Sequence, residues 1–378
     1  MHHLRAILVV WLAAATCLGG MVRFDASSAP ATALAANTGL AGRVDAYLTA
    51  QEQAHRFSGA VVVARGDTVL LSKGYGAADW TRQLPNTAHT SFPLRAFDVV
   101  GPAIQQLEDA GKLHDGDSIC RYILHCPTAW APITLAALLD ETSGLHDYAN
   151  DTSRPSIEGK PYSLAGLVDY IAGEPLDAAP GKVCCSANPD IPVEEEIVQR
   201  VSGMSFGAYL QRHILSPLGL EHTGYYANLP PRQASLAAGY MGWQQPAFDD
   251  ERYDTSSFGG MLYTSAADYA RLDQALFAGR LLSAASTVKL TTTSHTLVPP
   301  ADRGFGMTQV GSTGLGAIVT HLDGHTIIWY GYTIGTIGMG AAGLYIPDQH
   351  IVVTAFDNDI SAAPADLLAQ LLTRVLST

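Results

Sequence analysis

The chain has 378 residues and a formal net charge of −13 at pH 7, with 47% hydrophobic and 15% charged residues. This composition is typical of a soluble globular protein, and the length suits one large domain or two lobes with a substantial core. An acidic balance of this size disfavours nucleic acid or an anionic membrane surface as a partner.

The N-terminal segment has the pattern of a secretory signal. Two histidines and Arg5 precede an apolar run over 6–18, and small residues follow. We therefore assign residues 1–35 to a signal peptide, with cleavage sites at 31–33 or 33–35. The alternatives are a lipoprotein modified at Cys17 and an uncleaved anchor, which the short apolar run disfavours. We expect a secreted or periplasmic protein with no membrane span after signal removal.

Four cysteines follow this signal, in two pairs. Cys120 and Cys126 flank one short loop, so they can form a disulfide in an oxidising compartment. Cys184 and Cys185 are adjacent, and two free thiols are the simpler interpretation because a disulfide between neighbouring residues is strained.

The first elements are a helix, a hairpin and a second helix. Apolar residues recur at helical spacing over 39–55, and two β-rich runs, 58–64 and 68–74, are joined by Arg65-Gly66-Asp67. A buried helix is expected to begin near Asp98, with Asp98 as its N-cap and Gly111 just after its end.

Later strands are expected at 304–307, 326–330, 343–347 and 351–357, followed by a closing helix at 365–376. The order of strands, then helices, then strands and a final helix indicates an α+β fold.

Several segments match the framework of a known family. They are Gly76-Ala77-Ala78-Asp79, Pro85-Asn86-Thr87, Thr142-Ser143-Gly144-Leu145, Pro217-Leu218-Gly219 and the run from Ser257 to Asp268. In these segments the chain resembles the serine β-lactamase and penicillin-binding protein superfamily, in its class C β-lactamase-related branch. The resemblance implies a β-lactamase/transpeptidase-like α+β fold, in which N- and C-terminal helices flank an antiparallel sheet beside a mostly helical lobe. It divides residues 36–378 into a sheet lobe (36–95 and 265–378) and a helical lobe (96–264), with a cleft between them.

The family's nucleophile motif is missing. Family members open the central helix with S-x-x-K, a serine and a lysine that helps to deprotonate it. Here Arg95-Ala96-Phe97-Asp98 stands in that region, and Ser91 is followed three residues later by Leu94. Asp98 is either a helix cap or a recruited base, and Arg95 is either an anion-binding group or a solvated or paired arginine.

Two further motifs are altered. After Pro180-Gly181, Ser186 replaces the family's tyrosine and Asn188 is kept, although both residues also suit a polar turn. On the later inner strand, Tyr332 replaces the family's cation, whereas Thr333 is kept and Gly335 follows. Tyr332 is either a cleft hydroxyl or a packing residue. Glu141 stands where the family has a histidine before T-S-G-L.

These substitutions lead to three hypotheses, and they leave open whether the chain is an enzyme. The first is a non-hydrolytic pseudoenzyme that binds a small-molecule or peptide-like ligand in the cleft between the lobes. The second is a repurposed acid/base enzyme of the isomerase or cyclase type, and the third is a weak serine hydrolase or esterase. The candidate catalytic residues are Ser186, Asn188, Tyr332, Asp98 and Glu141, and the candidate ligand-binding residues are Arg95, Thr333 and Gly335. We expect no cofactor and no metal, because no zinc-binding spacing is found.

Overall fold

A computed structural model describes most of the chain after the N-terminal segment. The described residues are 39–95, 97–148, 162–182, 188–225, 236–242, 244, 246, 261–289, 292, 295–296, 310–312, 317–322, 324–334, 338–359 and 371. Within these ranges, the side chains at 94–95, 97–98, 261, 295–296, 310–312, 318 and 330–334 are outside the description. In this part of the chain, no helix has the length and apolar character needed to cross a membrane.

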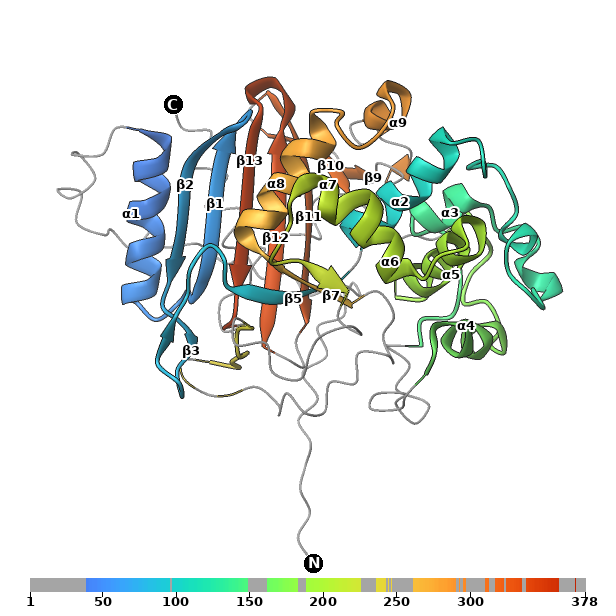
Figure 1. The fold of residues 1–378 in the computed structure, drawn as a ribbon, viewed down its shortest axis with the longest axis horizontal. Helices are drawn as coiled ribbons and strands as arrows, with labels where there is room; N and C mark the ends of the chain where they lie inside the picture. The colour runs from blue at the N-terminus through green and yellow to red at the C-terminus, as the bar shows by residue number, and fades with distance from the viewer. Residues whose placement is uncertain are drawn as a thin grey trace, which may run out of the picture.

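An antiparallel sheet of eight strands is the frame of the molecule, in the order β2-β1-β13-β12-β11-β10-β9-β8 (Figure 1). The strands are β1 (Gly59–Arg65), β2 (Thr68–Tyr75), β8 (His295–Thr296), β9 (Val310–Ser312), β10 (Ile318–Leu322), β11 (His325–Ile334), β12 (Met339–Ile346) and β13 (Ile351–Asp357). The predicted hairpin and the predicted strands around 326–330, 343–347 and 351–357 are confirmed. The strand predicted at 304–307 lies outside the described residues.

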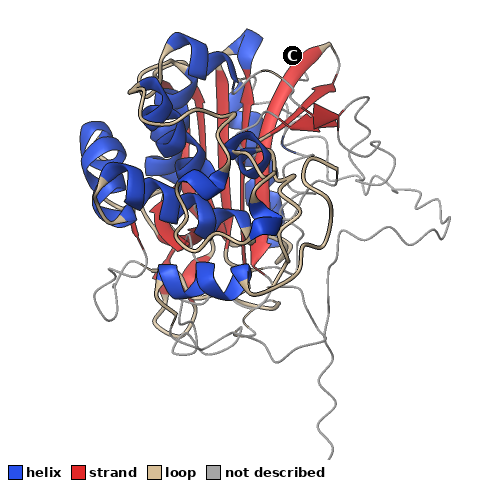
Figure 2. Ribbon diagram, turned by 90° about the vertical axis from the view of Figure 1, so that its right-hand side faces the viewer, coloured by secondary structure: helices blue, strands red, loops and turns tan. Residues whose placement is uncertain are grey.

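The two faces of this sheet carry separate hydrophobic cores. Side chains alternate along a strand, so Val61 packs with Val44 and Leu48 of α1 (Leu40–Gln53), whereas Val62 packs in the core that contains Phe356. On this second face α8 (Ala266–Phe277) lies against β1 and β13. Figure 2 shows the strands running behind a layer of helices. The predicted closing helix lies outside the described residues, except for the helical Leu371.

The second core extends into a group of helices. They are α2 (Phe97–Asp109), α3 (Leu135–Leu139), α4 (Leu164–Ala172), α5 (Asp190–Ser202), α6 (Phe206–Leu210), α7 (Ser216–Leu218) and α9 (Ala284–Lys289). Here α5 packs against α2, α3, α4 and α6. A small sheet of β5 (Ser91–Arg95), β7 (Met261–Ser265) and β6 (Gly224–Tyr225) leads into α2, and β3 (Ala77–Asp79) pairs with β4 (Leu84–Pro85).

The start of α2 differs from its prediction. The helix begins at Phe97, so Asp98 lies inside its first turn and is not the N-cap residue. The N-cap assignment was wrong because it depends on the first helical residue, which sequence patterns locate only to within one or two positions. A carboxylate in the first turn still interacts favourably with the helix dipole. Gly111 follows the helix with φ +67°, as a residue after a helix end requires.

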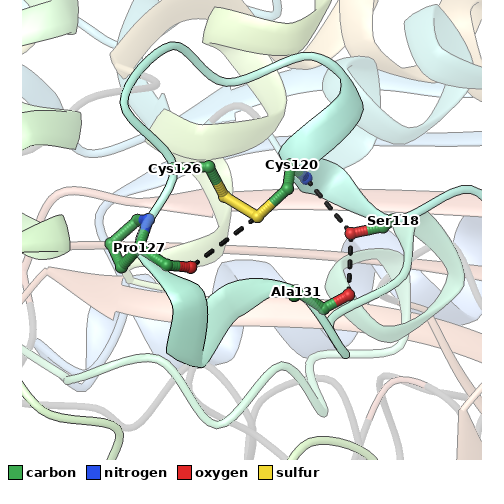
Figure 3. Close-up of a disulfide and its surroundings, with 5 residues drawn as sticks. All are labelled: Ser118, Cys120, Cys126, Pro127 and Ala131. Atoms are coloured by element: carbon green, nitrogen blue, oxygen red, sulfur yellow. Dashed lines mark hydrogen bonds between the residues drawn. A yellow bond between two sulfur atoms is a disulfide. The ribbon is translucent and has the colours of Figure 1, made fainter.

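The predicted disulfide between Cys120 and Cys126 is present, with an S–S distance of 1.95 Å (Figure 3). It joins η2 (Ile119–Arg121) to the residue before Pro127, which precedes η3 (Thr128–Trp130). Ser118 Oγ accepts a hydrogen bond from the Cys120 N–H (3.3 Å) and donates one to the Ala131 carbonyl (2.8 Å). The loop is therefore closed covalently and by hydrogen bonds. Cys184 and Cys185 lie outside the described residues.

The loop after α3 is joined by its backbone to the segment around Pro180. The Gly181 N–H donates to the Thr142 carbonyl (2.7 Å), and the Asp177 N–H donates to the Gly144 carbonyl (2.9 Å). Gly144 has φ +73°, and a Cβ at this position would lie 2.2 Å from the Ala178 carbonyl oxygen. Glycine is therefore required here both by the backbone conformation and by the close approach of the two segments.

We expect the double substitution Cys120→Ser/Cys126→Ser to lower the free energy of unfolding by about 2 kcal/mol, because the closed loop is short. Denaturant unfolding of the oxidised protein and the variant measures this difference. The wild-type protein under reducing conditions is the matched control and should behave like the variant. Equal stability of the oxidised protein and the variant would contradict the assignment.

We expect Gly144→Ala to destabilise the protein by about 2–4 kcal/mol, because a strained backbone angle and a steric clash act together. Gly111→Ala is the matched control, because Gly111 has a similar φ of +67° but no atom within 4 Å of its added Cβ. That variant should lose only about 1 kcal/mol. Equal losses in thermal and chemical unfolding would show that the contact with Ala178 carries no cost.

Candidate functional site

The structure describes the predicted site residues to different extents. Arg95 ends β5 opposite Met261, Asp98 lies in the first turn of α2, and Tyr332 and Thr333 lie in β11 opposite Ala341 and Gly340. The side chains of these four residues are outside the description, and Ser186 and Gly335 lie outside the described residues altogether. Their meeting in one cleft stays a prediction. Asn188 and Glu141 have described side chains, and both lie near the start of α5.

Asn188 is held by a chain of hydrogen bonds from the loop after α3. Its Nδ2 donates to Asp147 Oδ1 at 2.9 Å. The Asp147 N–H in turn donates to Asp177 Oδ2 (2.9 Å), and Asp177 Oδ1 contacts His146 Nδ1 at 2.8 Å. Because Asp177 also binds the Gly144 carbonyl through its own N–H, the backbone of this loop fixes the orientation of the Asn188 amide.

Asp190 opens α5 and is almost fully removed from water, with 1% of its surface exposed. The buried Ser143 hydroxyl donates a short hydrogen bond to Asp190 Oδ1 and accepts one from the Leu145 N–H (3.1 Å). Asp190 Oδ2 is buried and accepts no hydrogen bond from the residues that the structure describes. For this oxygen, no hydrogen bond within the described structure replaces the hydrogen bonds to water that burial removes.

Glu194 lies one turn further along α5, with 4% of its surface exposed. The next two glutamates make polar contacts: Glu195 Oε2 accepts from the Tyr225 hydroxyl (3.0 Å), and Glu196 pairs with Arg200 (2.6 Å). The other Glu195 oxygen, Oε1, is buried without a hydrogen bond from a described residue. Among the described residues, Glu194 has no hydrogen-bond or ion-pair partner. It is therefore a nearly buried carboxyl group whose charge nothing in the described structure balances.

These two carboxyl groups differ from ordinary ones in acidity. Burial raises the pKa of Glu194 to about 8, and the charges of Glu141 and Glu195 act in the same direction. Burial also raises the pKa of Asp190 well above its usual range; the Ser143 hydrogen bond opposes this, and the charges of Glu194, Glu141 and Asp147 add to it. Both groups therefore favour the protonated form at neutral pH, and a cation nearby would favour the ionised form.

The cluster of Glu141, Asp147, Asp190 and Glu194, with Asn188 beside it, is the candidate site. We call it the α5 acidic site. It can exchange protons near neutral pH, and it can attract a cation. No three histidine, cysteine, aspartate or glutamate side chains are arranged to hold a metal ion in the described ranges.

Sequence reasoning missed Asp147, Asp190 and Glu194, although one signal was available. Glu194-Glu195-Glu196 lies between Val193 and Ile197 in a helical stretch. Three consecutive residues spread over about 200° of a helix, so they cannot all face solvent when apolar residues flank them. At least one of these glutamates had to face the protein interior.

We expect the stability of the protein to fall as the pH rises from about 4.5 to 8. The unfolded chain releases the Glu194 proton near pH 4.3, whereas the folded protein keeps it to about pH 8. The contribution of Glu194 to the free energy of unfolding is therefore fully present below its pKa in the unfolded chain. Above that pKa the contribution falls by about 1.4 kcal/mol per pH unit until the pH reaches the pKa of Glu194 in the folded protein. Unfolding by denaturant at several pH values measures the slope.

Glu194→Gln should make this slope shallower and should stabilise the protein at pH 8 relative to the wild type, because the amide cannot ionise. Glu221→Gln makes the same chemical change at an exposed position and should keep the wild-type slope. A Glu194→Gln variant with the wild-type slope would show that this carboxyl group is not the source.

Comparisons with known proteins place the chain in a family. The Beta-lactamase family profile matches residues 44–373. A penicillin-binding protein of Bacillus subtilis is 27% identical over 304 residues, which are 74% of this chain and 64% of that protein. The teichoic acid D-alanine hydrolase of Staphylococcus aureus is 26% identical over 238 residues, which are 61% of this chain and 56% of that protein. The chain thus spans about three fifths of the length of these curated relatives.

Solved structures show the same fold. A D-amino acid amidase from Ochrobactrum anthropi, complexed with D-phenylalanine, has a TM-score of 0.74 and 18% identity, covering 90% of this chain and 99% of that one. An octameric penicillin-binding protein homologue from Pyrococcus abyssi has a TM-score of 0.72 and 20% identity, covering 89% and 77%. The family match extends over most of the chain, and the sheet and helices correspond to those of these structures. The chain therefore belongs to the β-lactamase family, within the serine hydrolase superfamily, and has its α+β fold.

Proposed function

We propose that this protein is an exported, non-hydrolytic member of the β-lactamase family that binds a small-molecule or peptide-like ligand in the cleft between its lobes. The observation that carries the proposal is the composition of α2. From Phe97 to Asp109 this helix contains no serine and no lysine. The family's acyl-enzyme reaction uses a serine nucleophile beside a lysine, and this helix carries neither residue.

The nearest serine before the helix does not substitute. Ser91 lies in β5, pairs with Ser265 of β7, and exposes 1% of its surface. A nucleophile must reach its substrate within about 3–3.5 Å, which a serine enclosed in a small sheet cannot do. The position of Ser91 therefore supports a structural role.

The lysines with described contacts are also occupied elsewhere. Lys73 of β2 pairs with Asp45 of α1 (2.6 Å), and Lys289 binds Glu108 (2.6 Å), near the C-terminal end of α2, and Asp115. These ion pairs hold both ammonium groups in place. The hydrogen bonds from Lys289 to Asp115 and Glu108 also raise the pKa of Lys289 despite its partial burial, whereas a lysine that acts as a base must be neutral. Neither lysine therefore supports an acyl-transfer role.

Export is supported by two independent features. The N-terminal segment has the pattern of a secretory signal, and the Cys120–Cys126 disulfide suits an oxidising compartment. An exported protein would bind its ligand outside the cytoplasm.

A second candidate function is acid/base catalysis without a covalent intermediate. The observation that favours it is the raised pKa of Glu194, about 8, because a carboxyl group that titrates near neutral pH suits a general acid or base. The low exposure of Glu194 opposes direct contact with a substrate, so ligand binding is the better supported function.

We expect neither a fluorophosphonate probe nor a penicillin to acylate the protein, because no activated serine stands at the start of α2. Intact-mass spectrometry after prolonged incubation measures labelling, and the unfolded protein is the control for non-specific reaction. Stoichiometric labelling would contradict the proposal. Its loss in Ser143→Ala or in Ser186→Ala would then identify the serine that acts as the nucleophile.

A further inference from the structure

We propose that His89 and His222 form a binding site for a divalent transition-metal ion of the zinc, copper and nickel class, with the Asp268 carboxylate orienting the His222 ring. This inference goes beyond the proposed function and does not depend on it, because it uses none of the candidate cleft residues. No spacing in the sequence indicates the pair, since the two histidines lie in distant segments of the chain.

The imidazole rings of His89 and His222 lie against each other, with centroids 4.8 Å apart and planes inclined at 36°. A zinc ion bound by an imidazole lies in the plane of the ring, about 2.1 Å from the nitrogen and so about 3.2 Å from the ring centroid. Two centroids 4.8 Å apart then subtend an angle of about 100° at a shared ion, near the tetrahedral value. Because inclined planes intersect, whereas parallel planes do not, both rings can contain one ion in their planes.

The ring nitrogens of this pair have little competition from other side chains. His89 is exposed, and its ring makes no hydrogen bond with any residue in the described ranges. The His222 side chain is 38% exposed, and its ring makes one polar contact within the same ranges, from Nδ1 to Asp268 Oδ1 at 3.9 Å. Both rings can therefore take up an ion directly from solvent.

Asp268 of α8 fixes which side of the His222 ring faces the protein. Its side chain is nearly buried, and Oδ2 accepts hydrogen bonds from the His222 N–H (2.7 Å) and the Thr223 hydroxyl (2.9 Å). The other oxygen, Oδ1, attracts a proton on His222 Nδ1 electrostatically. Metal-binding histidines commonly direct one nitrogen at a carboxylate, which keeps the proton on that nitrogen and leaves the other one as the ligand. We therefore assign Nε2 of His222 as the ligand atom.

The turn that carries His89 is joined to the same end of α8. The Thr90 N–H donates to the Thr87 carbonyl (3.0 Å), and the His89 N–H donates to the Thr87 hydroxyl (3.2 Å). The Ala267 N–H, in the first turn of α8, donates to the Ala88 carbonyl (3.0 Å). Hydrogen bonds thus hold the backbone of both histidines to the start of α8, which reduces the ordering that metal binding would require.

Two imidazole ligands determine which metals suit the site. Imidazole suits zinc, copper and nickel, whereas calcium and magnesium prefer oxygen ligands. Water fills the remaining coordination positions, since no group of three histidine, cysteine, aspartate or glutamate side chains is arranged to hold a metal in the described part of the chain. Protons compete with the metal for the ring nitrogens, so affinity should fall as the pH decreases.

The test is isothermal titration calorimetry of the untagged protein with zinc chloride, in a buffer that contains excess calcium. Calcium occupies acidic surface groups but not imidazoles, so it separates the site from general attraction of cations to an acidic protein. We expect saturable zinc binding that calcium does not displace and that is weaker at about pH 6 than at about pH 8. Absence of saturable binding, or displacement of zinc by calcium, would overturn the inference.

Matched variants locate the site. His89→Asn and His222→Asn should each weaken zinc binding at least about tenfold, because even the loss of a residue that only orients a metal ligand costs about 10–100-fold. His125→Asn removes an exposed histidine outside the pair, at a φ of +54° that asparagine tolerates, and should bind zinc like the wild type. Equal weakening in all three variants would show that zinc binds surface histidines in general, against the inference.

Asp268→Asn tests the positioning role of the carboxylate. The amide keeps the size of the side chain and one oxygen acceptor but removes the negative charge beside His222 Nδ1. Zinc binding should weaken about tenfold. The ring ¹⁵N chemical shifts of His222 should show a smaller population of the tautomer with its proton on Nδ1. An unchanged tautomer population would contradict the role assigned to Asp268, because a purely structural effect leaves it in place.

Discussion

The removal of Asp190 and Glu194 from water at the start of α5 constrains the helices that pack around α5. An isolated buried carboxylate costs several kcal/mol, and a group in that position takes up a proton or finds a cation. Because α5 packs against α2, α3, α4 and α6, it cannot move toward solvent without opening these contacts. We therefore expect the charge state of these two side chains to affect how tightly α5 packs against the four helices.

The surrounding framework resists relaxation of this constraint. The loop after α3 is tied to the segment around Pro180 by backbone hydrogen bonds, and Gly144 lets the two chains meet without a side chain between them. Ser143 from the same loop bonds Asp190, and Asp147 bonds Asn188. The loop thus connects the start of α5 to the segment around Pro180, and Asp190 and Asn188 both bind side chains of this same loop.

Periodic patterns predicted most of the framework. The α1 stripe, the β1–β2 hairpin and the strands β11 to β13 follow from local apolar repeats and turn residues, because each element buries one face along its own length. The disulfide was predictable from two cysteines in one loop. The family motifs then indicated how these elements are arranged, which local patterns alone do not determine.

The candidate site was predictable only in part. Asn188 and Glu141 were found because they occupy motif positions, whereas Asp147, Asp190 and Glu194 follow no motif and become a group only when α5 meets the loop after α3. Helix periodicity shows that one glutamate of Glu194-Glu195-Glu196 faces inward, but it does not show which one lacks a partner. That depends on Tyr225 and Arg200, which bind Glu195 and Glu196, whereas no residue in the described ranges is found to bind Glu194.

The three substitutions in the family motifs change the charge at those positions in the same direction. The lysine of the family's S-x-x-K motif has no counterpart in this chain. Tyr332 stands where the family has a cation on the inner strand, and Glu141 stands where it has a histidine before T-S-G-L. Each change removes a positive or protonatable nitrogen, and the last adds a carboxyl group. A cleft with fewer cations is expected to stabilise less well the negative charge that develops on an acyl oxygen. This expectation is the physical reason behind the proposal that the protein does not carry out acyl transfer.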